Sequence, residues 1–277
     1  MTYNSKRKRG DFLNILFCGD CGIKLGIYLS LLSILKHTKE KVNVFILTAS
    51  VEERQAIPSS FGNELEEKTN GGERLSVKII DISDIFNGYL PTANMSTRFT
   101  PLCMLRLFAD KVEEIKGKIL YLDTDILCRK DIKPLYDIDI SDVEIAGVPD
   151  RYGKWFFGNQ LRHNYLNSGV LLMNMENIRK SDLFSKCRTL CRNKKMFMPD
   201  QTALNKLSVK KKINRRFNEQ GKIRKDTIIK HFTTFFKFFP YIRAVTIKPW
   251  EYDKVHNELK VFEFDDIIET AKRRPIK

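Results

Sequence analysis

The chain has 277 residues, of which 42% are hydrophobic and 30% charged, and its formal net charge is +15. This composition excludes a disordered chain, and the length is sufficient for one large α/β domain with its own core. No run of 18 or more apolar residues occurs, so we expect no membrane-spanning helix.

Apolar runs and helical periodicities alternate along the first half of the chain. They predict strands at residues 13–18, 42–48, 77–82, 118–122, 143–148 and 169–173, and helices at residues 25–35, 51–68 (interrupted at Pro58 and Gly62), 102–112, 175–191 and 200–207. Strands that alternate with helices are typical of an α/β protein with a mainly parallel central sheet and helices on both faces.

We divide the chain into a basic N-terminal arm (1–11), one domain (12–250) and a basic C-terminal extension (251–277). Residues 206–225 are predicted to be a basic loop, which is either a solvated surface or a site for an anionic partner. No helix-turn-helix, RNA-recognition or zinc-finger signature accompanies this charge, so nucleic acid is not expected. The apolar stretch after the N-terminal arm is too short for a signal peptide, which favours a cytoplasmic protein.

The strand at residues 118–122 ends in two aspartates, Asp123 and Asp125. Side chains alternate along extended chain, so acids two residues apart point the same way. They can share a hard divalent cation through oxygen ligands, and a histidine as third ligand shifts the preference from magnesium towards manganese. In open α/β sheets, nucleotides bind at the edge where such strands end.

Three segments in order carry a resemblance: Tyr-Leu-Asp-Thr-Asp at 121–125, Asn-Ser-Gly-Val-Leu-Leu-Met-Asn at 167–174, and Asp-Gln-x-x-Leu-Asn at 200–205. Over residues 12 to 250 the chain resembles the retaining glycosyltransferases of family eight, in particular lipopolysaccharide galactosyl- and glucosyltransferases. The resemblance implies the GT-A nucleotide-diphospho-sugar transferase fold, a UDP-sugar donor and Mn²⁺, with Mg²⁺ as the alternative cation.

The resemblance also implies roles for individual residues. The metal ligands would be Asp123, Asp125 and His231, and the catalytic residues beside the anomeric carbon would be Asp200 and Gln201. Donor contacts would come from Asp20 at the uracil, and from Arg106, Lys118, Thr124, Asp150 and Asn167 at the sugar and phosphates. An amide is a poor nucleophile, so we favour front-side displacement with retention over the two-carboxylate arrangement of glycoside hydrolysis.

The sequence departs from the family pattern in two places. The aromatic residue that often follows the uracil-binding aspartate is replaced here by Gly22 and Ile23. The diphosphate-binding lysine is either Lys237, at the usual spacing from His231, or Lys248, which keeps the Lys-Pro-Trp context; we favour Lys248.

The sequence thus predicts a metal-dependent hexosyltransferase that moves glucose or galactose from a UDP-sugar to a hydroxyl of a cell-envelope glycan or glycolipid. The alternatives are a metal-dependent nucleotidyl- or phosphotransferase, and a non-catalytic polyanion-binding protein. The aromatic residues between 232 and 241 are interpreted either as core or as a peripheral contact with the inner face of the membrane.

Overall fold

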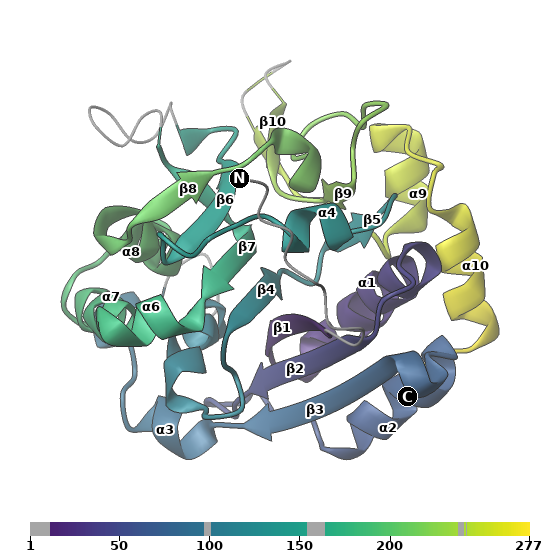
Figure 1. The fold of residues 1–277 in the computed structure, drawn as a ribbon. Coiled ribbons are helices and arrows are strands. Elements are labelled where there is room, and N and C mark those ends of the chain that lie inside the picture. The colour runs from purple at the N-terminus through teal and green to yellow at the C-terminus, as the bar shows by residue number, and fades with distance from the viewer. Residues whose placement is uncertain (1–11, 97–100, 154–163, 238–240, 242) are drawn as a thin grey trace, which may run out of the picture.

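The computed structural model describes residues 12–96, 101–153, 164–237, 241 and 243–277. A seven-stranded sheet forms its centre, in the order β3-β2-β1-β4-β7-β6-β8 (Figure 1). The strands are β1 (Leu13–Gly19), β2 (Val42–Thr48), β3 (Leu75–Asp81), β4 (Lys118–Leu122), β6 (Ile145–Pro149), β7 (Leu166–Asn174) and β8 (Lys210–Lys212).

The sheet is mainly parallel, as expected, but β7 runs against both of its neighbours. Strands β3, β2, β1 and β4 are parallel, and β8 is parallel to β6, whereas β7 is antiparallel to β4 and to β6. The amino end of β7 therefore lies beside the carboxyl end of β4, with Leu122 opposite Val170. Two polar segments that are far apart in the sequence thereby meet at one edge of the sheet.

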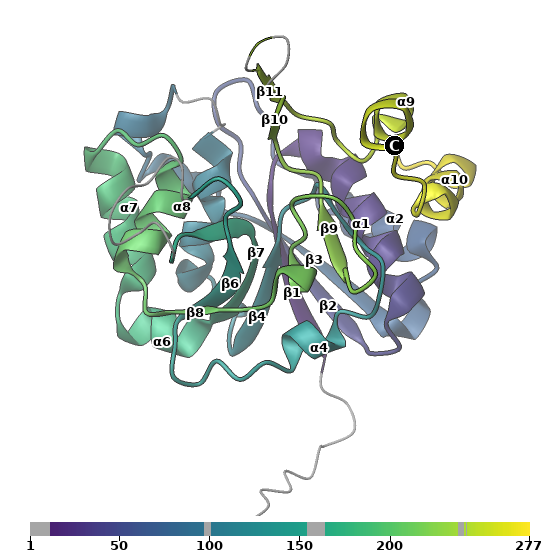
Figure 2. The ribbon, with the colours of Figure 1, turned by 90° about the horizontal axis from the view of Figure 1, so that it is seen from above.

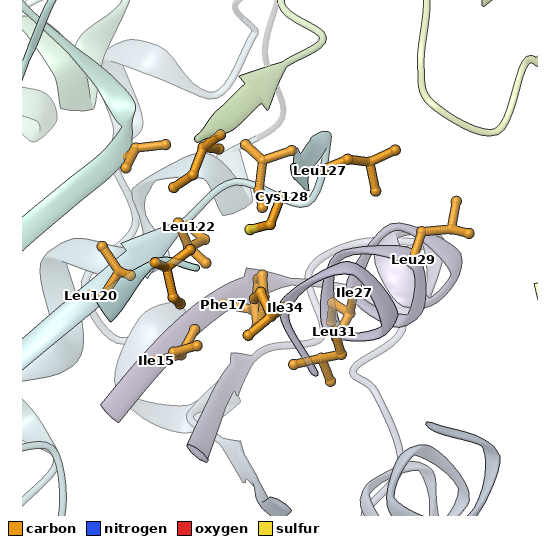
Figure 3. Packing of buried hydrophobic residues seen from close by; sticks show 14 of the residues in the cluster. Ile15, Phe17, Ile27, Leu29, Leu31, Ile34, Leu120, Leu122, Leu127 and Cys128 are labelled. Carbon is orange, nitrogen blue, oxygen red and sulfur yellow. The ribbon is translucent and has the colours of Figure 1, made fainter. Parts of the chain in front are cut away.

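Helices cover both faces of the sheet, because alternate side chains of its strands enter two separate cores. Ile15 and Phe17 pack with α1 (Lys24–His37), α2 (Ser60–Thr69) and α10 (Asp265–Arg273), as Figure 3 shows for the β1–α1 part. Leu16 and Tyr121 face the opposite core. That core is formed with α3 (Ser83–Asn87), the 3₁₀ segment Pro101–Lys111, α6 (Met175–Lys180), α7 (Leu183–Asn193) and α8 (Pro199–Leu207). Figure 2 shows α6, α7 and α8 on the opposite side of the sheet from α1, α2 and α10.

Smaller elements complete the carboxyl edge of the sheet. Strand β5 (Ile126–Cys128) pairs antiparallel with β9 (Ile229–His231), which places His231 opposite Ile126. Strands β10 (Phe235–Lys237) and β11 (Arg243–Val245) form a hairpin above it. The remaining elements are α4 (Lys133–Tyr136), α9 (Tyr252–Lys254), the π turn Val255–Leu259 and 3₁₀ turns at Cys21–Ile23, Gly72–Arg74, Thr92–Asn94 and Arg215–Phe217.

Four expected elements differ in extent or type. The helix over residues 51–68 is reduced to α2, which begins only after Pro58 and contains Gly62 without interruption. The helix over 175–191 breaks into α6 and α7, because Asp182 adopts the left-handed conformation (φ 56°). The helix over 102–112 is of the 3₁₀ type. The basic loop over 206–225 contains the edge strand β8. Its three consecutive lysines are atypical of a strand, so the sequence did not predict it.

The C-terminal segment packs on the rest of the chain. Phe264, Ile267 and Ala271 of this segment belong to the same buried cluster as α1. Residues 1–11, the predicted basic arm, lie outside the described residues. Among the described residues, no helix combines the length and the apolar character needed to cross a bilayer.

Candidate active site

A cavity of about 430 Å³ opens where β1 and β4 end and β7 begins. Most of the residues predicted to bind the donor, the metal or the reacting sugar line it: Asp20, Arg106, Asp123, Thr124, Asp125, Asp150, Asn167, Asp200, Gln201, His231 and Lys248. The cavity lies outside the carboxyl ends of parallel strands, where open α/β sheets bind their ligands.

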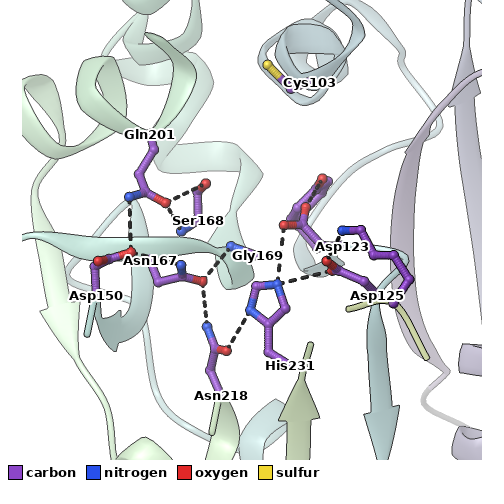
Figure 4. Close-up of polar contacts among 12 residues, drawn as sticks. Cys103, Asp123, Asp125, Asp150, Asn167, Ser168, Gly169, Gln201, Asn218 and His231 are labelled. Carbon is purple, nitrogen blue, oxygen red and sulfur yellow. Dashed lines mark hydrogen bonds and ion pairs between the residues drawn. The ribbon is translucent and has the colours of Figure 1, made fainter. Parts of the chain in front are cut away.

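Asp123, Asp125 and His231 converge at the centre of this cavity (Figure 4). The His231 Nε2 atom lies 3.1 Å from Asp125 Oδ1 and 3.8 Å from Asp123 Oδ2, and one ligand atom from each residue lies within 4.8 Å of the others. Gly169 leaves room for them, because a Cβ there would lie 2.2 Å from His231 Cε1. Any side chain at position 169 would therefore displace the histidine.

A chain of hydrogen bonds fixes the tautomer of His231. The Gly169 N–H donates to Asn167 Oδ1, so the Asn218 group facing that oxygen must be its NH₂. The Asn218 oxygen then faces His231 Nδ1 at 3.0 Å, so Nδ1 carries a proton and donates. With Nδ1 committed to Asn218, Nε2 is the ring atom that faces the two carboxylates, and in the neutral ring its lone pair is available to a metal ion there.

Asp125 provides a direct test of whether a cation fits. Its Oδ1 atom is buried, faces this lone pair and has no hydrogen-bond partner among the described residues. A buried carboxylate oxygen without a partner is costly, and a divalent cation between the ligands would supply one. Two carboxylates and an imidazole are a donor set that Mn²⁺ accepts.

Lys248 is the lysine that reaches this cluster. Its Nζ atom lies 2.6 Å from Asp125 Oδ2. Burial alone would raise the pKa of Asp125, but a protonated His231 and the ammonium of Lys248 outweigh burial, so that without a metal ion the net pKa falls well below its usual range. Lys237 ends β10, and its side chain lies outside the described part of the structure. The choice between Lys248 and Lys237 as the diphosphate-binding lysine therefore stays a prediction.

Arg106 connects the metal cluster to the catalytic candidates. Its guanidinium is buried and lies 3.2 Å from both Asp123 Oδ1 and Asp200 Oδ2. It also donates to Ser168 O at 2.5 Å, and it stacks 4.0 Å from the Tyr121 ring centroid. Burial raises the pKa of Asp200, and the charge of Arg106 partly offsets this rise.

Asp150, Asn167 and Gln201 form a polar network on the other side of His231 from Asp125 (Figure 4). Asp150 Oδ2 accepts from Asn167 Nδ2 at 3.0 Å and from Gln201 Nε2 at 3.3 Å. Gln201 Oε1 accepts from the Ser168 N–H at 2.9 Å and from Ser168 Oγ at 3.1 Å. These side chains hold one another in place without any added ligand.

At the opposite end of the cavity, both carboxylate oxygens of Asp20 already accept hydrogen bonds from protein groups. Its Oδ1 accepts from the Gly22 N–H at 2.9 Å, and its Oδ2 pairs with Arg54 Nη1 at 2.8 Å. Arg54 is half exposed, lines the cavity, and comes from a turn after β2 that the Val51–Arg54 bridge closes. Arg54 is thus a planar cation beside Asp20. The family pattern often has an aromatic residue next to this aspartate, which this chain lacks.

The structure does not bring Lys118 to the cavity, so the prediction of a donor contact is corrected. Lys118 begins β4, whereas Asp123 follows its end, about 16 Å away at the rise of a strand. Its ammonium donates to the carbonyl oxygens of Tyr136 and Ile138 at 3.0 and 2.8 Å. Lys118 therefore connects α4 and the residues after it to the amino end of β4, away from the cavity.

Three residues of the cavity or its support were missed in the sequence. Asn218 orients His231, Tyr121 donates to Asp123 Oδ1 at 2.7 Å, and Arg54 pairs with Asp20. Tyr121 could have been found, since it shares the face of Asp123 two residues away. Asn218 and Arg54 stand in polar segments without any motif, so only the tertiary structure reveals them.

A sequence model described as glycosyl transferase family 8 matches residues 14–254. A probable glycosyl transferase Gly of Streptococcus gordonii is 34% identical over 41% of this chain and 16% of its own length. The lipopolysaccharide 1,3-galactosyltransferase of Salmonella typhimurium is 26% identical over 52% and 47% of the two lengths. The lipopolysaccharide glucosyltransferase WaaO of Escherichia coli is 29% identical over 48% and 44%.

The matched part is less than half the length of each of these three relatives. A solved structure aligns over nearly the whole of both chains: galactosyltransferase LgtC in complex with donor and acceptor sugar analogues. Its TM-score is 0.69 and its identity 20%, and the alignment covers 95% of this chain and 97% of LgtC. At this identity the likeness concerns the fold.

Proposed function

The chain belongs to glycosyl transferase family 8 and has a GT-A fold, and on this premise we propose a metal-dependent, retaining hexosyltransferase. It would move glucose or galactose from a UDP-sugar to a hydroxyl of a cell-envelope glycan or glycolipid. The observation that carries the proposal is the Asp123–Asp125–His231 cluster, which shares one cavity with the hydrogen-bonded network of Asp150, Asn167 and Gln201. The names of the lipopolysaccharide galactosyl- and glucosyltransferase relatives support the choice of a hexose.

Asp123, Asp125 and His231 would hold the cation. When bound, Mn²⁺ would supply Lewis-acid neutralisation of the donor diphosphate, with Mg²⁺ as the alternative ion. The orphaned Oδ1 of Asp125 and the His231 Nε2 lone pair support this assignment. Lys248 would leave Asp125 and bind the diphosphate, because an ammonium 2.6 Å from one ligand can reach an anion held next to it.

Asp20 and Arg54 would hold the uracil. A carboxylate can accept from the base N–H, and a guanidinium can lie on the face of the ring. Arg54 would then serve in place of the aromatic residue that often follows the uracil-binding aspartate, where this chain has Gly22 and Ile23. Thr124, between the two aspartates, lines the cavity on this side and completes the donor-binding set.

Asp150, Asn167, Asp200 and Gln201 would surround the sugar. The two acceptor lone pairs of Gln201 Oε1 are already engaged by Ser168, which argues against attack by this oxygen on the anomeric carbon. Asp200 is paired with buried Arg106, so it is not free to act as a nucleophile either. Front-side displacement, in which the leaving phosphate accepts the proton of the acceptor hydroxyl, is consistent with both observations.

The proposal is tested by incubating the purified protein with UDP-glucose or UDP-galactose and Mn²⁺, and by separating the nucleotide products. Release of UDP with one of the two donors, and its loss on chelation, is the expected result. Release of UMP or pyrophosphate would instead identify a phosphoryl or nucleotidyl transferase. No turnover and no UDP binding would overturn the donor assignment.

A further inference from the structure

The rim of the cavity farthest from Asp20 is aromatic. Tyr152 and Phe236 line it and pack edge to face, with ring centroids 5.0 Å apart and planes at 86°. The Tyr152 hydroxyl accepts from the Phe236 N–H at 3.3 Å, which joins the two rings to each other. Aromatic rings present a flat apolar surface to the C–H face of a sugar, so a glycan acceptor can enter here.

A cationic surface adjoins this rim. Arg151, next to Tyr152, has its guanidinium carbon 5.5 Å from the Tyr152 ring centroid. Its N–H donates to Gln220 Oε1 at 2.8 Å, and a Cβ on Gly221 would lie 3.0 Å from Arg151 Nη1. The aromatic rim is therefore continuous with the loop that follows Gly221.

This loop joins a second basic segment. Lys130 Nζ donates to Lys225 O at 2.7 Å, and Arg129 Nη1 donates to the carbonyls of Arg224 and Lys225 at 3.2 and 3.4 Å. These bonds gather cations without neutralising them, because the acceptors are backbone oxygens. We define the basic rim as six residues: Arg129, Lys130, Arg151, Lys222, Arg224 and Lys225.

The acids near the basic rim are already used. Glu219 and Asp226 both pair with Arg215, at 2.5 and 2.8 Å. Within the described ranges only Arg224 of the basic rim approaches a carboxylate, with Nε 3.8 Å from Glu219 Oε2. The basic rim therefore presents an uncompensated positive field beside the cavity, which attracts anions.

We take a hydrated polyanion as the occupant of the basic rim, because complementary charge supplies the attraction. Membrane-surface segments combine basic residues with exposed aromatic or aliphatic side chains that enter the interface. Among the described residues at positions 129–130, 151 and 215–228, none is an exposed large apolar side chain, so this part of the surface offers charge alone.

We propose that the acceptor is an anionic glycan, whose terminal sugar lies on Tyr152 and Phe236 while its phosphate or carboxylate groups bind the basic rim. This inference rests on the proposed function, since it names the acceptor class of the same site. It gives the positive charge of the segment 206–225 a role that the donor does not need.

The test compares two triple variants, each of which removes three positive charges. The first replaces Lys222, Arg224 and Lys225 with Gln, and the matched control replaces Lys272, Arg273 and Arg274 on and after α10 with Gln. Binding of dextran sulfate is measured against ionic strength, with neutral dextran as the uncharged glycan. Thermal unfolding checks that both variants fold.

Wild-type protein is expected to bind dextran sulfate and not dextran. The rim variant should lower the salt slope by about 2 to 3 and weaken binding roughly 100-fold near 0.1 M salt, while the control changes little. An equal loss in both variants would mean bulk charge only and would overturn the proposal. So would vesicles of phosphatidylglycerol whose binding depends on the rim while dextran sulfate binding does not.

UDP binding by the wild-type protein, measured separately, keeps the two claims apart. If UDP does not bind but the rim captures dextran sulfate, the donor assignment fails and a polyanion-binding surface remains. If UDP binds and the rim variant retains full affinity for dextran sulfate, the acceptor inference alone fails.

Discussion

The two ends of the cavity differ in how far their buried polar atoms have hydrogen-bond partners within the protein. At the end with Asp123, Asp125 and His231, Asp125 Oδ1 has no hydrogen-bond partner among the described residues and lies 3.1 Å from His231 Nε2. At the sugar end, Gln201 and Asp150 are satisfied by each other and by neighbouring groups. The first arrangement would be completed by the cation we propose, whereas the second is complete in the protein alone.

This difference distinguishes side chains that bind a ligand from side chains that stabilise the shape of the cavity. Removing a metal ligand should cost activity and little stability, because that ligand is poorly satisfied without its cation. Removing a member of the sugar network should cost both, because a buried donor or acceptor then loses its partner. Measurements of turnover and of the free energy of unfolding on the same variants therefore test this difference between the two ends of the cavity.

The largest effect is expected for Asp125→Asn. It removes one anionic ligand, so turnover should fall by about 1000-fold or more. The free energy of unfolding measured without metal should change by less than about 1 kcal/mol, because Oδ1 has no hydrogen-bond partner among the described residues and the amide oxygen of Asn can still accept from Lys248 Nζ. Turnover close to that of the wild type would remove the metal role of Asp125.

Gln201→Ala should slow turnover by about 100-fold while UDP affinity changes by less than about threefold. It should also lower the free energy of unfolding by about 1–3 kcal/mol, because the buried Ser168 N–H loses its acceptor. Stopped assays and denaturant unfolding of the same preparation give both numbers. Parallel losses of turnover and UDP affinity would argue against placing this amide at the sugar.

Lys248→Ala should weaken UDP binding by about 10- to 100-fold, because a charge-assisted bond to the diphosphate is lost. Lys237→Ala tests the alternative lysine, and Lys118→Ala, at the other end of β4, is the control that should leave UDP affinity unchanged. Calorimetry of the three variants ranks them. A loss confined to Lys237→Ala would reverse the assignment.

The smallest effect is expected at the base. Arg54→Ala should weaken UDP binding by about 5- to 10-fold, since stacking of a guanidinium on a ring contributes about 1 kcal/mol. Arg54→Lys keeps the charge opposite Asp20 but loses the planar group, so it should recover only part of the affinity. Full recovery by lysine would show that pairing with Asp20, and not stacking, is what the donor needs.

Local patterns predicted the sheet and the helices on both faces, whereas most of the cavity residues were assigned by the resemblance to family eight. The strand before Asp123 and the strand predicted at 169–173, which the structure extends to Leu166–Asn174, are hydrophobic segments with polar residues beside them. Their meeting required only that the two polar ends share one edge, which the reversed β7 provides.

The sequence failed where a contact depends on the approach of distant segments. Lys118 matches a family position that contacts the donor, yet it begins β4 and so lies at the end of the strand away from the cavity. Asn218 reaches His231 across 13 positions, and Arg54 reaches Asp20 across 34. No periodicity encodes such contacts, and β8 was hidden because its three lysines are atypical of a strand.

The measurement that tests the central claim most directly is calorimetric binding of UDP to the wild-type protein, with Mn²⁺ and then with a chelator. The account predicts clear binding with Mn²⁺ that disappears on chelation, because the diphosphate is held through the cation on Asp123, Asp125 and His231. UDP binding of equal strength in the chelator, or none in either condition, would contradict it.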